Sequence, residues 1–274
     1  MAGRLTVCPT PIGNLDDLTP RVRRALADAD LVACEDTRRT GLLFDRLEIE
    51  RPRLVSNHEG NESERAVQLV QQIERGARVA LVSDAGTPAI SDPGYPLIRA
   101  CISRGIDLEV LPGASAITTA LVASGLPPDR WRFEGFLPRR PGELERVLSS
   151  QETVVALESP RRLPDSLLAL ATLAPDRPAA VCRELTKLHE EVARGPLAEL
   201  ARRFRDQARG EIVVVIGAAS ARASTPDAAL AVDALRRLVQ SGARPRAAAS
   251  VVAALTGTRA NDLYRALTGR APRE

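Results

Sequence analysis

Short apolar runs alternate with longer amphipathic stretches over the first 111 residues. The runs are rich in Leu, Val and Ala and predict five strands, at residues 5–8, 31–35, 53–56, 79–83 and 108–111. Between the first two, Thr19-Pro20 has the form of an N-cap followed by a proline in the first helical turn, so we expect a helix at residues 20–28. Strands that alternate with helices are typical of a mostly parallel sheet.

The pattern starts again after Pro112-Gly113. Residues 114–124 are small and apolar and predict a buried helix, which Gly125 and Pro127-Pro128 close. A second α/β set follows, with strands at 133–136, 153–157, 179–183 and 212–216 and an amphipathic helix at 163–173.

From Ala219 onward Ala, Arg and Leu dominate, and short helices are expected, with a start at Thr225-Pro226 and stops at Gly242, Gly257 and Gly269. We therefore predict an N-terminal α/β domain (1–116), a C-terminal α/β domain (117–218) and a small basic helical region (219–274).

Composition narrows the class of protein. The chain has 274 residues, of which 44% are hydrophobic, and no apolar run approaches the roughly 18 residues that cross a bilayer. The first ten residues lack the features of a signal peptide, so we expect a cytoplasmic protein. Its four cysteines form no CxxC pair and only two histidines are present, so a metal site or a histidine triad is hard to assemble.

The net charge of +3 is unevenly distributed. Residues 218–274 hold nine Arg, three Asp and one Glu, a net charge of +5, whereas the rest of the chain carries −2. A basic tail on a near-neutral body suits contact with RNA, although solvated arginines on helix faces give the same count.

Two strand exits are opened by glycine. Residues 83–94, Ser-Asp-Ala-Gly-Thr-Pro-Ala-Ile-Ser-Asp-Pro-Gly, follow the strand at 79–83, and Pro112-Gly113-Ala114-Ser115-Ala116 follows the strand at 108–111. Ligands of open α/β sheets bind at such strand ends, and we expect the two loops to form the walls of one pocket. Ordinary capped turns, with Ser115 as a helix cap, are the alternative.

Familiar nucleotide fingerprints are absent. The chain contains no Gly-X-Gly and no Walker lysine motif, which disfavours NAD and ATP. Charged clusters occur instead at four strand ends, beginning at Glu35, His58, Glu158 and Arg183. Each alone reads as a solvated loop or an ion pair, and together they suggest a shared site.

Taken together, these motifs resemble a known family. The run consists of Pro9-Thr10-Pro11-Ile12-Gly13-Asn14-Leu15, Glu35-Asp36-Thr37-Arg38, the 83–94 loop, the 112–116 loop, Ser124-Gly125-Leu126-Pro127, Gly135-Phe136-Leu137-Pro138, Glu158-Ser159-Pro160 and Arg183-Glu184-Leu185-Thr186-Lys187. In this order, over residues 4–217, it resembles the 16S rRNA cytidine 2′-O-methyltransferases of the tetrapyrrole methylase superfamily.

The resemblance implies a fold, a reaction and a set of contacts. It implies the two-domain class III methyltransferase α/β fold, here with a C-terminal helical appendix, in a homodimer that binds S-adenosylmethionine between its domains. It also implies 2′-O-methylation of a cytidine ribose in the decoding region of 16S rRNA. The implied cofactor contacts are Pro11, Gly86, Thr87, Ile90, Ser91, Ser115, Ala116 and Leu157.

The chain departs from the family pattern at three positions. Leu157 stands where an aromatic residue is usual, Arg161 where a histidine is usual, and His189 where an aromatic residue is usual. These positions fall near the expected cleft, so they concern how the adenine or ribose is packed.

A ribose 2′-hydroxyl is a poor nucleophile and needs a base. We expect Asp92 or Glu184 to accept its proton and Lys187 to stabilise the developing alkoxide. Phosphates would be held by Arg38, Arg39 and Arg161. The alternative is that Glu184 and Lys187 only pair with each other.

Two other functions are weighed against this one. The same fold could methylate a small tetrapyrrole, but the arginine pairs and the basic tail suit a polyanion better. A non-catalytic RNA-binding adaptor on the ribosome is disfavoured because one Trp, two Tyr and four Phe leave few stacking platforms.

Overall fold

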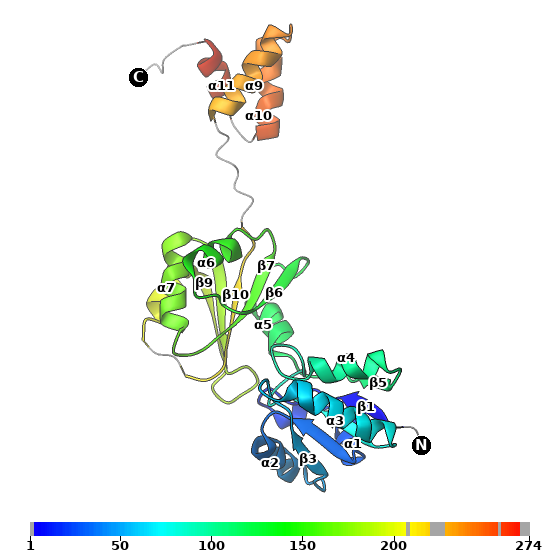
Figure 1. Cartoon of the computed structure of the whole chain (residues 1–274). Coiled ribbons are helices and arrows are strands. Elements are labelled where there is room, and N and C mark those ends of the chain that lie inside the picture. The colour runs from blue at the N-terminus through cyan, green and yellow to red at the C-terminus, as the bar shows by residue number, and fades with distance from the viewer. Residues whose placement is uncertain (1–2, 207–208, 220–227, 257–258, 269–274) are drawn as a thin grey trace.

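Ten strands form two five-stranded sheets in the computed structural model, which describes residues 3–206, 209–219, 228–256 and 259–268 (Figure 1). The first sheet has the order β3-β2-β4-β1-β5, and all its pairings are parallel. Its strands are β1 (Arg4–Val7), β2 (Leu31–Cys34), β3 (Arg53–Ser56), β4 (Arg78–Leu81) and β5 (Asp107–Val110). The predicted parallel sheet is confirmed.

Helices cover both faces of the first sheet. One face packs on α3 (Glu62–Glu74) and α4 (Tyr95–Ser103), and the other packs on α1 (Pro20–Ala27) and α2 (Thr37–Leu47). Thr19 caps α1 as predicted, since its hydroxyl accepts the N–H of Val22. Because both faces are buried, the strand ends are left as the place where a ligand can reach the backbone.

The second sheet has the order β6-β7-β10-β8-β9 and is mostly antiparallel. In the described part of this second sheet, β6–β7 is the one parallel pair. The strands are β6 (Trp131–Phe136), β7 (Thr153–Glu158), β8 (Pro178–Arg183), β9 (Glu191–Pro196) and β10 (Ile212–Ile216). The sequence pattern missed β9, whose Gly195 and Pro196 are poor strand formers.

The two faces of the second sheet are covered differently. One packs on α6 (Pro141–Leu148), α7 (Leu163–Leu173) and α8 (Leu197–Arg203). The other packs on α5 (Ala116–Ser124) and on Ile12 from the first half of the chain. The loops of the first sheet therefore approach this second face, beside α5.

Three further helices follow, α9 (Ala228–Gln240), α10 (Pro245–Thr256) and α11 (Ala260–Thr268). They share a small core of their own, which includes Leu235, Val252 and Leu263. Each ends within two residues of the stops expected at Gly242, Gly257 and Gly269, while the start expected at Thr225-Pro226 lies outside the described residues. The domain limits 1–116, 117–218 and 219–274 stay predictions.

Candidate active site

The two glycine-opened loops meet directly. The hydroxyl of Thr87 donates to the carbonyl of Ala114 at 3.3 Å, which joins the loop after β4 to the loop after β5. Thr10 and Gly86 exchange backbone hydrogen bonds of 2.9 and 3.0 Å, so the segment after β1 joins the same assembly. Gly86 has a φ of +81°, a conformation that a side chain would strain.

The loop after β4 is held in an unusual backbone conformation. Ala89 and Ser91 have φ values of 67° and 62°, in the left-handed region that residues with a Cβ rarely adopt. Such conformations persist where the surroundings fix them, and here the N–H of Gly94 donates to Glu62 at 2.8 Å. Strain of this kind is found most often at ligand-binding sites.

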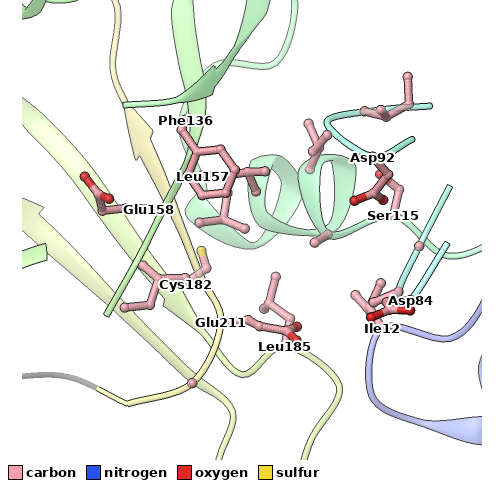
Figure 2. A pocket seen from close by; sticks show the side chains of 18 of the residues that line it. Ile12, Asp84, Asp92, Ser115, Phe136, Leu157, Glu158, Cys182, Leu185 and Glu211 are labelled. Carbon is pink, nitrogen blue, oxygen red and sulfur yellow. The ribbon is translucent and has the colours of Figure 1, made fainter. Parts of the chain in front are cut away.

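A cavity of about 420 Å³ lies between these loops and the second sheet (Figure 2). Ile12, Asp84 and Asp92 face Phe136, Leu157 and Cys182 across the hollow. Of the implied cofactor contacts, the cavity is lined by Gly86, Thr87, Ile90, Ser115, Ala116 and Leu157. Loops distant in sequence thus form the walls of a single pocket.

Ser115 occupies the N-cap position of α5 but makes no side-chain capping bond. The first N–H groups of a helix have no partner inside it, and at α5 they border the cavity at Ser115, Ala116 and Ile117. A carboxylate or another anionic group of a ligand would be favoured there. The alternative in which Ser115 serves only as a helix cap is therefore not supported, because its side chain makes no capping hydrogen bond.

Carboxylates dominate the charged groups around the cavity. Among the described lining residues are Glu35, Asp84, Asp92, Glu158 and Glu211, with Arg39 as the cation. Glu158 is buried and already satisfied by Arg162 at 3.2 Å and by the Ser166 hydroxyl. Asp84 is paired with Arg39 and Glu211 with Lys187, so Glu35 and Asp92 give the cavity its excess of negative charge, which suits a cationic ligand.

Two of these carboxylates have perturbed acidities. Burial, with the charge of Glu35 second, raises the pKa of Asp92 to about 6. Burial, with the charge of Asp84 second, also raises the pKa of Glu35. A carboxylate with a pKa near 6 is a stronger base than an ordinary one and is still mostly ionised at neutral pH.

Glu184 and Lys187 form an ion pair at 2.8 Å, and Lys187 also contacts Glu211 at 3.2 Å. The hydrogen bond from Lys187 lowers the pKa of Glu184. Burial opposes the charge of Lys187, but Glu184 and Glu211 together raise the pKa of the ammonium group. Lys187 is therefore a held cation, and Glu184 is a weaker base than Asp92.

The other expected residues lie around the main cavity rather than in its lining. Pro11 and Lys187 line an adjoining cavity, and Arg38 lines a shallow polar hollow beside Asp36. Ser91 lies between the lining residues Ile90 and Asp92, and its hydroxyl would be 4.0 Å from a Cβ on Gly135. Arg161 is exposed.

Several lining residues were not expected from the sequence. They include Ile12, Phe136, Cys182, Leu185, Glu211 and Val213. Phe136 is the second residue of the Gly135-Phe136-Leu137-Pro138 motif, so an aromatic residue directly after a glycine was the available signal. Ile12 and Glu211 reach the site only through the packing of distant segments.

The comparisons agree with this geometry. Residues 4–201 match the family model described as Tetrapyrrole (Corrin/Porphyrin) Methylases. The chain belongs to the tetrapyrrole methylase family. It is 46% identical over 273 residues to "Ribosomal RNA small subunit methyltransferase I" of Mycobacterium tuberculosis strain H37Rv, which covers 97% of this chain and 95% of that protein.

Another relative and a solved structure are similar to most of this chain. The protein of the same name from Thermotoga maritima is 41% identical and covers 78% of this chain with 98% of its own length. The crystal structure of uroporphyrin-III-C-methyltransferase from Thermus thermophilus superposes with a TM-score of 0.57 at 22% identity, covering 78% of this chain and 94% of that chain. The two-sheet class III methyltransferase fold of this tetrapyrrole methylase is thereby confirmed.

The described residues contain neither a candidate membrane span nor a candidate metal cluster. None of their helices has the length and apolar character needed to span a membrane. No cluster of three or more His, Cys, Asp or Glu among them is arranged to hold a metal ion.

Proposed function

We propose that the chain is an S-adenosylmethionine-dependent methyltransferase that 2′-O-methylates a cytidine ribose in the decoding region of 16S rRNA. The observation that carries the proposal is the carboxylate-lined cavity where the two glycine-opened loops meet the second sheet. The relatives named for methylation of small-subunit ribosomal RNA support the RNA substrate, at 46% identity along nearly the whole chain.

The residues present fit the methyl donor. Its adenine is apolar on both faces, and Ile12, Leu157 and Val213 offer an apolar wall. Its carboxylate suits the open N-terminus of α5, and its sulfonium and ammonium charges suit Asp84 and Asp92. When bound, the donor supplies a methyl group on a positively charged sulfur.

Gly86, Thr87, Ser115 and Ala116 would hold the donor mainly through the backbone. Ile90 and Leu157 would close over it from opposite sides, with Pro11 in the adjoining cavity and Ser91 next to Ile90 in the same loop. Since Leu157 replaces the usual aromatic residue, the neighbouring ring of Phe136 is the aromatic surface at this wall.

Asp92 is the residue we assign as the base that accepts the proton of the ribose hydroxyl. Its pKa of about 6 makes it better suited than Glu184, whose carboxylate is stabilised by Lys187. Lys187 would stabilise the alkoxide that develops as the proton leaves. Arg38 and Arg161, which do not line the donor cavity, and Arg39, at its border with the adjoining cavity, would contact phosphates.

The proposed ribosomal RNA substrate supports a location in the bacterial cytoplasm. The family resemblance supports a homodimer, which stays part of the proposal.

The test uses small ribosomal subunits that lack 2′-O-methylation and S-adenosylmethionine with a labelled methyl group. The expected result is label on the 2′-oxygen of a cytidine in the decoding region, located by mapping of modified nucleotides. A porphyrinogen offered as a competitor should remain unlabelled. Label on the porphyrinogen alone would identify a tetrapyrrole methyltransferase, and no donor binding in calorimetry would favour an adaptor.

A further inference from the structure

A second cavity of about 300 Å³ adjoins the donor cavity. The two share a wall formed by Ile12, Arg39, Asp84, Ala85 and Glu211. A molecule in the second cavity would therefore lie next to the donor, with these five residues beside both molecules.

The segment that lines the second cavity at Gly13 is packed tightly against the second domain. Gly13 packs so closely on the second domain that a Cβ there would lie 2.4 Å from the Lys187 side chain. The N–H of Asn14 donates to the Thr186 hydroxyl at 3.1 Å. Thr186 itself has a φ of 66°, so this contact fixes a strained turn. The cavity is thus built from both domains.

One face of α2 lines the second cavity. Arg39, Leu42, Leu43 and Arg46 follow the spacing i, i+3, i+4, i+7, which places them in one stripe. The opposite face, including Phe44, is buried in the core. Leu42 is 57% exposed although it is apolar. Leu42 and Leu43 therefore form a small apolar surface, here called the apolar ledge, between Arg39 and Arg46.

The charges of the second cavity differ from those of the first. Arg39, Arg46 and Lys187 line it, with Asp84 and Glu211 from the shared wall. Arg39 is paired with Asp84 at 3.1 Å, and Lys187 is paired with Glu211. Within the described part of the chain, no carboxylate lies at ion-pair distance from Arg46, so it holds the uncompensated positive charge.

We infer that the second cavity is the subsite for the acceptor nucleotide, with its phosphate on Arg46 and its apolar nucleoside face on Leu42 and Leu43. The inference rests on the proposed function and adds where the RNA strand enters. One cation without an ion-pair partner among the described residues, beside the apolar ledge, matches one phosphate beside one nucleoside. The ribose would then lie beside Lys187, where the second cavity meets the donor cavity.

The experiment compares Arg46→Gln and Leu42→Asp with the wild type in the small-subunit methylation assay. Both positions are exposed, so folding should be preserved. We expect kcat/KM for the subunit to fall about tenfold in Arg46→Gln, which is the scale of one lost charge-assisted contact. A loss of about the same size is expected in Leu42→Asp, which replaces apolar surface by a negative charge next to an anionic strand. The dissociation constant of the donor, from calorimetry, should not change.

Arg75→Gln is the matched control. Arg75 is exposed at the end of α3, just before β4 begins. It therefore lies at the amino ends of the strands, whereas both cavities lie at their carboxyl ends. Its kcat/KM should equal that of the wild type. Unchanged kcat/KM in Arg46→Gln, or an equal loss in the control, overturns the subsite. A wild-type protein that binds the donor but methylates no RNA overturns the proposed function itself.

Discussion

Asp92 offers the sharpest test of how the donor cavity works. The Asp92→Asn substitution keeps the shape of the side chain and removes its ionisation. Because the pKa of Asp92 is raised from 3.8 to about 6, the folded protein holds this proton more tightly than the unfolded chain does. By linkage, the free energy of unfolding falls as pH rises between these two values, and the full cost remains above pH 6.

The size of this cost follows from the shift. One pKa unit corresponds to about 1.4 kcal/mol, so a shift of two units sets an upper limit of about 3 kcal/mol. Asp92 is partly open to the cavity, and solvent screening reduces the figure to about 1–2 kcal/mol. Asp92→Asn should therefore be more stable than the wild type by about 1–2 kcal/mol at pH 8, and no more stable at pH 3.5.

Two measurements check the reasoning. Urea unfolding at several pH values gives the difference in stability, with Asp129→Asn, an exposed aspartate, as the control. Methylation kinetics should show kcat/KM reduced at least about a hundredfold and the inflection near pH 6 abolished. A stability difference that does not vary with pH would refute the burial argument, and a variant with normal turnover would refute the assignment of the base.

Three further predictions concern other parts of the molecule. Lys187→Ala should lower kcat/KM in the methylation assay while donor affinity is kept, and normal turnover would show that Lys187 only pairs with Glu184. Gly113→Ala places a Cβ 2.6 Å from the Pro9 side chain and should destabilise the protein by about 1–3 kcal/mol in urea unfolding, so an unchanged midpoint would contradict the close packing. Deletion of residues 219–274 should leave donor binding intact, because the helices of this region share a core of their own and none of their described residues lines the donor cavity. The deletion should weaken binding to ribosomal RNA and flatten its salt dependence, whereas unchanged RNA binding would assign the region to packing.

Much of the fold could be predicted because periodicity and capping are local signals. The strands at 53–56 and 212–216 and the helix at 163–173 have the limits that the sequence indicated. The antiparallel pairing of the second sheet could not be predicted. Every residue of β10 is buried, and a strand buried on both faces has the same continuous apolar pattern in a parallel or an antiparallel sheet.

The candidate site was predictable in part for a similar reason. Glycine and proline mark a loop wherever it occurs, so both walls at Gly86 and Gly113 could be found from sequence. Arg46 and Glu211 carry no such mark, since a charged residue on a helix or after a loop is usually only solvated. They belong to the site only because packing brings α2 and the segment before β10 to the same cavity.

An acidic donor cavity in an enzyme for a polyanion raises an electrostatic problem that the shared wall addresses. Asp84 accepts the N–H of Asp36 through one oxygen at 3.2 Å and Arg39 through the other at 3.1 Å. The Arg39 side chain is 68% exposed, so this ion pair adds little to stability. The pair fixes one charge of each sign where the two cavities meet. Glu35 and Asp92 line the donor cavity but not the second cavity, whereas Arg46 and Lys187 line the second cavity but not the donor cavity. A cationic donor and an anionic strand can then occupy neighbouring spaces, each beside charges of the opposite sign.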